Sequence, residues 1–302
     1  MPSTRPLPLL ALFSARFGCS RLAEFEAVAC RLGAGPVAWS WDHQQLALQG
    51  GDIGPRIVQA LPRLAESDHA WLADAAARSV GCRGVFECWG QGQSIEDCAA
   101  QAARLAGRHI LSRVTGSWRL DSVVLGAKRS QHGQQLGRRM EAFSPLLDHL
   151  GQRPVQLDNP QHHLWLVEDR QQLKLCEPLP NPPPRYMLLF QLSSTRPPIQ
   201  DTLRRLDLGR RAFLSTSTTP ADRAMVLCNL ALADSAGPDV SVLDPYCGSG
   251  GLLLAAAALG AQTVGSDLDW KIVSDNRVPI RIPASPSRPA RGVESVRMRD
   301  NF

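Results

Sequence analysis

The sequence contains no pair of cysteines spaced as Cys-x-x-Cys, although it has 8 cysteines in 302 residues. Structural zinc sites and dithiol redox sites commonly use such pairs, so the sequence predicts neither a zinc knuckle nor a redox dithiol, and no metal site. Cysteines scattered in this way suit a reducing compartment, in which disulfides are rare.

Long apolar runs are also missing. The segment LLLAAAALG at 252–260 is half of the roughly 18 to 20 residues that a membrane-spanning helix needs, so we expect a soluble, cytoplasmic protein without a membrane partner. The N-terminal residues contain arginine but no acidic residue before Glu24, a composition that organelle transit peptides share. PLLALFSA favours a first strand instead, because apolar residues at helical spacing follow it over 20–33.

An excess of acidic residues is missing as well, since the formal net charge is +5 and the sequence pI is about 8.9. A basic balance favours acidic partners such as nucleic acid, but an ordinary, slightly basic protein has the same composition. The charge alone leaves both interpretations open. The length suffices for about two domains.

Short strands and helices alternate over residues 1–175. We expect helices at 68–79, from Ser94 onward and at 131–150, with strands at 82–90, 117–125 and 162–170. This pattern predicts an α+β domain or a close pair of them. The proline-punctuated range 176–208 contains one expected strand, YMLLFQL, and we place a linker and the domain boundary there. A second domain follows over 209–302, with a helix at 220–233.

The glycine-rich turn DPYCGSGG at 244–251 lies between the strand VSVLD and the helix LLLAAAALG. This order predicts the first strand–helix unit of a nucleotide-binding parallel sheet, in which Gly248 and Gly250 let a ligand approach the backbone N–H groups. A second strand ends at Asp267, 23 residues after Asp244 and close to the spacing of about 20 at which a carboxylate meets ribose hydroxyls.

The turn lacks the G-x-G-x-x-G sequence of dinucleotide-dependent oxidoreductases. The carboxylate of Asp244 stands before the glycines, where it can accept hydrogen bonds from an ammonium group but would repel a pyrophosphate. The turn thus favours S-adenosylmethionine as cofactor and disfavours an oxidoreductase. A structural turn in another α/β fold is the alternative.

These residues resemble the cofactor motif of methyltransferases that modify exocyclic amino groups. Together with RSVGCRGVFECWGQGQSIED (78–97), NPQHHLWLVED (159–169) and GRRAFLSTSTTPADRAMVLCN (209–229), they resemble the eukaryotic tRNA guanine-10 N2-methyltransferase family. The resemblance implies an N-terminal THUMP-like RNA-binding half over 1–175, tRNA as substrate and a small zinc-containing activator subunit as partner. It also implies the cofactor-binding residues Asp244, Gly248, Ser249, Gly250, Asp267 and Asp269. Ser217 and Thr218 occupy the position of the family's Thr-Ser pair, which is altered in this sequence.

The Asp-Pro-Pro-Tyr type loop, which in this family holds the target amino group, has no counterpart after residue 269. We therefore expect residues 209–302 to form an incomplete α/β Rossmann-like methyltransferase domain, truncated at its C-terminus, without a catalytic residue and inactive alone. A tRNA-binding module without transferase activity is the alternative. NPPP at 181–184 resembles the loop, but a permuted enzyme would need further sheet strands before the turn and an aromatic residue at Pro184. We interpret this stretch as a linker.

Adjacent basic residues are candidates for contacts with tRNA phosphates, although such pairs more often lie on a solvated face. The resemblance favours phosphate contact for Lys128, Arg129, Arg138, Arg139, Arg210 and Arg211, and Arg204 and Arg205 form a further pair.

Overall fold

The structure is a computed structural model. It describes residues 7–14, 16–18, 20–34, 38–39, 56–61, 67–105, 111–125, 136–170, 185–193, 197–211, 214, 218–234 and 237–268. Among these, the side chains of 38–39, 56–61, 67–69, 105, 111, 136 and 138 are not described. The chain divides into two compact units. Unit 1 comprises Met1–Arg21, Val37–Ala77 and Gly81–Arg196, and unit 2 comprises Leu22–Pro36, Arg78–Val80 and Pro197–Phe302.

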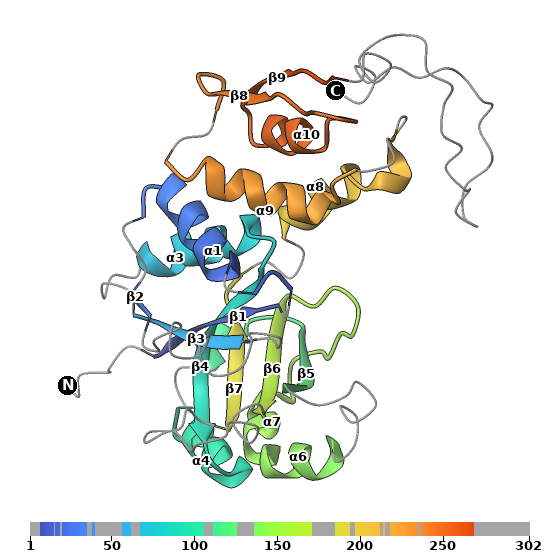
Figure 1. Cartoon of the computed structure of the whole chain (residues 1–302). Helices are drawn as coiled ribbons and strands as arrows, with labels where there is room; N and C mark the ends of the chain where they lie inside the picture. Colours follow the sequence, from blue (N-terminus) through green and yellow to red (C-terminus); the bar gives the residue numbers. More distant parts are fainter. Residues whose placement is uncertain are drawn as a thin grey trace. The chain divides into compact units, whose positions relative to one another are not determined.

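Unit 1 is built on a seven-stranded mixed sheet with the strand order β2-β3-β1-β4-β7-β6-β5 (Figure 1). Strands β5 and β6 pair in parallel, whereas the other neighbours pair antiparallel. The strand predicted at PLLALFSA is confirmed as β1, and those predicted at 82–90, 117–125 and 162–170 are confirmed as β4, β5 and β6. The strands are β1 (Leu9–Phe13), β2 (Ala38–Trp39), β3 (Arg56–Leu61), β4 (Cys82–Gly92), β5 (Trp118–Leu125), β6 (His162–Asp169) and β7 (Tyr186–Gln191).

The helices assigned to unit 1 are α3 (Ser67–Arg78, of which Arg78 belongs to unit 2), α4 (Ile95–Leu105), α5 (Leu111–Arg113), α6 (Leu136–Ala142) and α7 (Ser144–Leu150). The helix start predicted at Ser94 is confirmed, because the hydroxyl of Ser94 accepts a hydrogen bond from the Asp97 amide at 3.0 Å. The single helix predicted at 131–150 is wrong, since α6 and α7 are separated at Phe143. Pro145 lacks an N–H group and lies in the first turn of α7, where a proline starts a helix more readily than it continues one.

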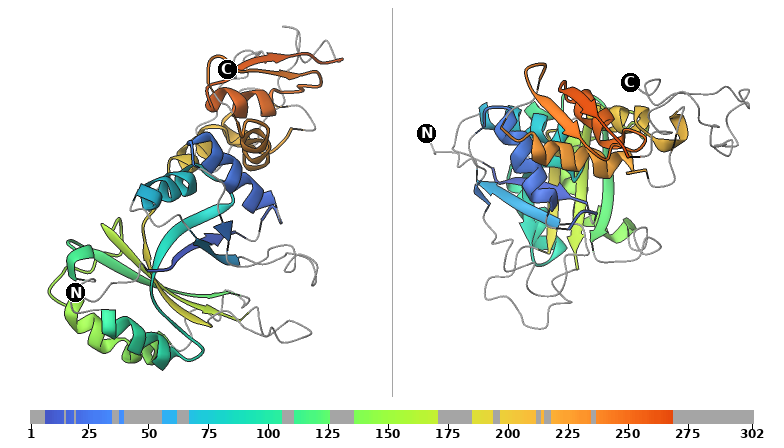
Figure 2. Two further views of the ribbon diagram at one scale, coloured as in Figure 1. Left: turned by 90° about the vertical axis from the view of Figure 1, so that its left-hand side faces the viewer. Right: turned by 45° about the horizontal axis from the view of Figure 1, so that its top comes forward.

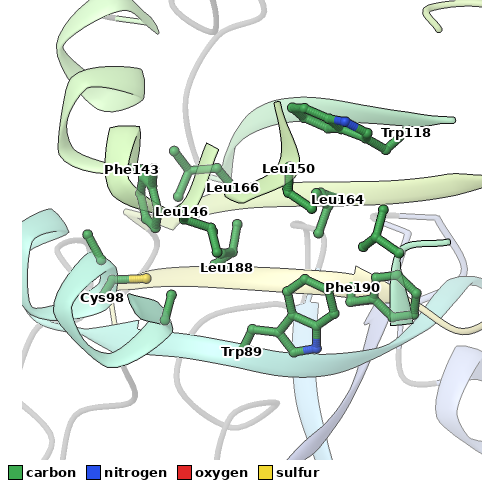
Figure 3. Packing of buried hydrophobic residues seen from close by; sticks show 13 residues of the cluster. Trp89, Cys98, Trp118, Phe143, Leu146, Leu150, Leu164, Leu166, Leu188 and Phe190 are labelled. Carbon is green, nitrogen blue, oxygen red and sulfur yellow. The ribbon is translucent and has the colours of Figure 1, made fainter. Parts of the chain in front are cut away.

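Apolar side chains pack against both faces of the unit 1 sheet. On one face, which α4, α6 and α7 accompany in the left view of Figure 2, a cluster gathers around Trp89 and Phe190. Figure 3 shows this cluster, in which the two rings stack with centroids 4.7 Å apart and planes 7° from parallel. A second cluster includes Phe86 of β4 and Leu189 of β7, whereas Trp89 and Phe190 of the same two strands belong to the first. Because successive side chains of a strand point to opposite faces of the sheet, each strand contributes to both apolar layers.

Unit 2 contains the elements of the predicted second domain. They are α8 (Pro198–Arg205), the 3-10 helix η4 (Leu208–Arg210), α9 (Ala221–Ala231), β8 (Ser241–Asp244), α10 (Gly251–Ala258) and β9 (Gln262–Gly265). The helices predicted at 220–233 and at LLLAAAALG, and the strand predicted at VSVLD, are confirmed as α9, α10 and β8. Strands β8 and β9 pair in parallel, and α10 lies between them and α9 (Figure 1).

Unit 2 also includes a helix from the N-terminal part of the sequence, α1 (Ser20–Arg31), from Leu22 onward. The amide of Asn229 on α9 donates a hydrogen bond to the Glu24 carboxylate and accepts one from the Arg31 guanidinium, both at 2.7 Å. Glu24 and Asn229 are both fully buried. This polar network joins α1 to α9 across about 200 positions of sequence.

The predicted linker at 176–208 contains regular structure where the chain is described. Strand β7 pairs with both β4 and β6, and α8 follows at Pro198. The strand predicted at YMLLFQL is therefore confirmed, and it lies inside the sheet of unit 1. The domain boundaries themselves remain a prediction.

Candidate cofactor-binding turn

The turn predicted to bind a cofactor joins β8 to α10. Asp244 pairs in register with Gly265, and because parallel strands end on the same side of a sheet, the residues after β8 and β9 meet there. The Ser266 amide donates to the Asp244 carbonyl at 3.0 Å, and the Cys247 amide donates to the Ser266 carbonyl at 2.9 Å. Backbone hydrogen bonds thus hold the turn against the segment that follows β9.

Two glycines of the turn have left-handed backbone conformations, with φ of +50° at Gly248 and +79° at Gly250. Residues with a Cβ atom rarely adopt such angles. Gly250 is the N-cap residue of α10 and provides no side chain to cap it. The first N–H groups of a helix have no partner within the helix, so this end of α10 can receive an electronegative ligand group.

The two aspartates at this edge have different contacts. One Asp267 carboxylate oxygen, Oδ2, accepts a hydrogen bond from the Gly248 amide at 2.8 Å, which connects the segment after β9 to the glycine turn. The second strand, predicted to end at Asp267, ends at Gly265. Oδ1 of Asp244 accepts from the Tyr246 amide at 3.0 Å. A carboxylate has about four acceptor positions, so these bonds leave capacity for a ligand's hydroxyl or ammonium group.

Ser249 and Cys247 support the turn from inside. The Ser249 side chain is 2% exposed and its hydroxyl lies 2.8 Å from that of Thr218, a pairing that the sequence analysis did not predict. Cys247 is buried, and burial, with added repulsion from the charges of Asp267 and Asp244, raises the pKa of its thiol. The thiol therefore stays protonated near neutral pH and is no nucleophile.

The predicted cofactor residues Asp244, Gly248, Ser249, Gly250 and Asp267 thus lie in one segment, and Asp269 lies outside the described residues, as does Ser217. A further residue, Arg211, lies beside the turn, where no sequence pattern had predicted it. A Cβ atom added to Gly251 would lie 3.5 Å from Nη1 of Arg211, which was predicted to contact RNA.

The residues predicted to contact RNA differ in their exposure to solvent. Lys128 and Arg129 lie outside the described residues, as does the side chain of Arg138 on α6. Arg210 is exposed, whereas Arg139 and Arg211 are 4% and 6% exposed. Neither buried guanidinium is on the surface, which disfavours direct contact with an RNA phosphate.

Arg139 instead binds Glu168, a carboxylate that is 1% exposed. Arg170 and Arg185 also donate to Glu168, at 2.7 and 2.9 Å, and the Tyr186 hydroxyl donates to it at 3.3 Å. Burial alone would raise the pKa of Glu168, but the hydrogen bonds from Arg170 and Arg185 and the nearby positive charges outweigh it and lower the pKa. Three guanidinium groups around one carboxylate leave a formal excess of two positive charges.

Among the residues that the structure describes, no three His, Cys, Asp or Glu side chains gather as metal ligands would. In the same residues, no helix is both long enough and apolar enough to cross a membrane.

No protein-family model matches the sequence. The chain is similar to the tRNA (guanine(10)-N(2))-methyltransferase of Schizosaccharomyces pombe, with 25% identity over 195 residues, 64% of this chain and 38% of the relative. The tRNA (guanine(10)-N(2))-methyltransferase TRMT11 of Homo sapiens is 25% identical over 198 residues, 65% of this chain and 40% of the relative. A tRNA (guanine(10)-N2)-dimethyltransferase of Methanothermobacter thermautotrophicus is 47% identical over 36 residues, 12% of this chain and 11% of the relative.

Two solved structures are also similar. TrmN from Thermus thermophilus has 19% sequence identity and a TM-score of 0.45, and the match covers 87% of this chain and 66% of that chain. SMU.472, solved in complex with SAH, has 12% identity and a TM-score of 0.44, with 85% and 56% covered. Because both TM-scores are below 0.5, neither similarity assigns a function. The chain spans about 40% of the length of the two eukaryotic relatives.

Proposed function

We propose that the chain is part of an S-adenosylmethionine-dependent tRNA (guanine-10-N2)-methyltransferase. The observation that carries the proposal is the turn after β8, where Asp244, the left-handed glycines 248 and 250 and Asp267 meet at the start of α10. The sequence similarity to tRNA guanine methyltransferases supports the same function. When bound, S-adenosylmethionine would supply a methyl group, which passes from its sulfonium to the guanine amino nitrogen with release of a proton.

The residues of the turn fit such a ligand. Glycines without Cβ atoms leave the start of α10 open to close approach, and Asp267 stands where a carboxylate can accept hydrogen bonds from ribose hydroxyls. Asp244 precedes the glycines and can accept from the ligand's ammonium group. Each residue contributes binding and orientation, which is the main means by which a transferase lowers the barrier of a bimolecular reaction.

Calorimetric titration of residues 1–302 with S-adenosylmethionine tests the site. We expect Asp267→Ala to weaken binding by roughly 1 to 3 kcal/mol, the range for hydrogen bonds left unmade. Asp267→Asn keeps an acceptor for the Gly248 amide and should show a smaller loss. Asp239→Ala, an exposed acidic residue before β8, is the matched control and should bind normally. An unchanged affinity in Asp267→Ala would remove this residue from the site.

For the RNA-binding half, which we propose to be THUMP-like, we assign phosphate contact to Arg170 and Arg185. Glu168 holds both guanidinium groups in place, and both side chains are about a third exposed, at 34% and 35%. Arg210, Lys128 and Arg129 are further candidates. Gel shifts of residues 1–302 with tRNA across a salt series should show an affinity that falls steeply as the salt concentration rises. Replacing Arg170 or Arg185 by Met should reduce the magnitude of the slope of log affinity against log salt concentration by about one. Arg83→Met, an exposed arginine elsewhere in unit 1, is the control.

The second candidate function is a tRNA-binding module without transferase activity. Residues 1–302 contain no Asp-Pro-Pro-Tyr sequence, which favours this alternative for these residues on their own. We therefore expect no transfer of radiolabelled methyl from S-adenosylmethionine to unmodified tRNA, with or without the zinc-containing activator subunit that we propose as a partner. Label in N2-methylguanosine above a blank without enzyme would make NPPP at 181–184, outside the described residues, the first candidate for the loop.

A further inference from the structure

Arg211 is a buried cation with two unused donor groups. Its side chain is 6% exposed, and its Nε donates to the Leu206 carbonyl at 3.2 Å. Nη1 and Nη2 are both buried and have no hydrogen-bond partner in the described part of the chain. Burial lowers the pKa of Arg211, and the negative charge of Asp207 offsets this only in part. A buried charge without a partner destabilises the folded chain by several kcal/mol, so a bound anion beside this guanidinium would be strongly favourable.

One of the two nitrogens, Nη1, lies at the start of α10. Nη1 is 3.5 Å from the position that a Cβ atom of Gly251 would occupy, and Gly251 is the first residue of that helix. The N-terminal end of a helix carries a partial positive charge and exposed N–H groups, which bind anions. Two positive features from different segments therefore converge beside the glycine turn.

We propose that Arg211, with the first amides of α10, binds the carboxylate of the amino-acid end of S-adenosylmethionine. This assignment rests on the proposed function. Because the guanidinium is buried beside the glycine turn, its anion has to be a small group held in the turn, which a phosphate in the backbone of an RNA strand is not. The amino-acid end of the cofactor carries one carboxylate and one ammonium group, and Asp244 provides the complementary charge for the ammonium. Arg210, the exposed neighbour, keeps the role of an RNA contact.

The experiment compares two probes on residues 1–302 by calorimetry. S-adenosylhomocysteine carries the amino-acid end, whereas 5′-methylthioadenosine has the same nucleoside and thioether without it. We expect Arg211→Met to weaken S-adenosylhomocysteine binding about 10- to 100-fold, the range for a hydrogen bond to a charged group, and to leave 5′-methylthioadenosine binding unchanged. Arg210→Met should bind both probes like the unmodified chain and bind tRNA more weakly.

The stability of the ligand-free chain gives a second readout. Met keeps the apolar stem and removes an unpaired buried charge, so Arg211→Met should unfold at the same or a higher temperature than the unmodified chain. A lower unfolding temperature, or an equal loss of both probes, would overturn the assignment in favour of a structural role. If Arg211→Met lowers the affinity for tRNA but leaves S-adenosylhomocysteine binding unchanged, the assignment is overturned and Arg211 contacts an RNA phosphate instead. If the unmodified chain binds neither probe, the proposed function itself fails; if it binds both equally well, only the carboxylate site fails.

Discussion

The two sheets of this molecule differ in how they are supported. The seven-stranded sheet of unit 1 packs apolar clusters on both faces. In unit 2, Val242 of β8 packs with α9 and α10, whereas Leu243 on the other face is 65% exposed and Val264 of β9 is 59% exposed. Among the described residues, β8 and β9 pair only with each other. The proposed cofactor turn therefore lies on the less supported sheet, in line with the general placement of ligand-binding segments in regions of low local stability.

The largest effect that tests this comparison is expected at Glu168. Replacing Glu168 by Gln should destabilise unit 1 by about 3 to 5 kcal/mol at pH 7, because it leaves the buried Arg139 without its anionic partner. Hydrogen exchange measured segment by segment reports on each unit by itself, so it is the appropriate assay.

The same variant predicts a pH dependence with a definite sign. The pKa of Glu168 is lowered in the folded state, so its contribution to stability is complete above the unfolded pKa, about 4.3 for a glutamate, and is lost as the pH falls through the folded value. The difference between the Gln variant and the unmodified chain should therefore shrink below about pH 4. A difference that is the same at pH 7 and pH 3 would contradict the ion-pair account.

Leu166 tests the face of the unit 1 sheet that carries the cluster around Trp89 and Phe190. It is 1% exposed and packs in the cluster around Trp89. Leu166→Ala should lower the free energy of unfolding of unit 1 by about 2 to 5 kcal/mol, through lost burial and the cavity that remains. Hydrogen exchange should show the loss in β6 and its neighbours and leave α9 and α10 unchanged. An effect confined to unit 2 would contradict the division into two units.

Strong local patterns explain which elements could be predicted from the sequence. β1 and β7 are short apolar runs, of five and six residues. The glycines with Asp267 at the expected distance indicated the proposed cofactor site. The break at Phe143 was missed because the Ser144-Pro145 pair, which favours a new helix start, was read as part of one continuous helix.

Features that depend on distant residues could not be predicted in this way. Adjacent arginines look alike in a sequence, yet Arg210 is exposed and Arg211 buried. Arg139 is buried and binds Glu168, a residue of β6 that follows it by 29 positions. The packing of α1 on α9 depends on Glu24 and Asn229, which are 205 positions apart. For the same reason, cutting the chain after residue 198 would separate Glu24 from Asn229.

Asn229 tests the network that attaches α1 to α9. Its amide contacts both Glu24 and Arg31, so Asn229→Ala should destabilise unit 2 by about 1 to 3 kcal/mol, the cost of buried polar groups losing a partner. Arg223→Ala, an exposed change on the same helix, should have little effect and is the control. Faster exchange in α1 and α9 together would support the network. Exchange in α9 alone would show that α1 is held by other contacts.

Leu243 tests the exposed face of the unit 2 sheet, where we expect the smallest change in the free energy of unfolding. Because its side chain is 65% exposed, Leu243→Ser should change the free energy of unfolding by less than about 0.5 kcal/mol. Leu253→Ser, at a position of α10 that is 2% exposed, is the matched control and should destabilise unit 2 strongly. Exposed apolar residues on a short sheet with free edges promote association, so Leu243→Ser should also reduce self-association in sedimentation velocity at rising concentration. If Leu243→Ser proves as costly as Leu253→Ser, Leu243 is packed against other residues, and the contrast between the two sheets fails.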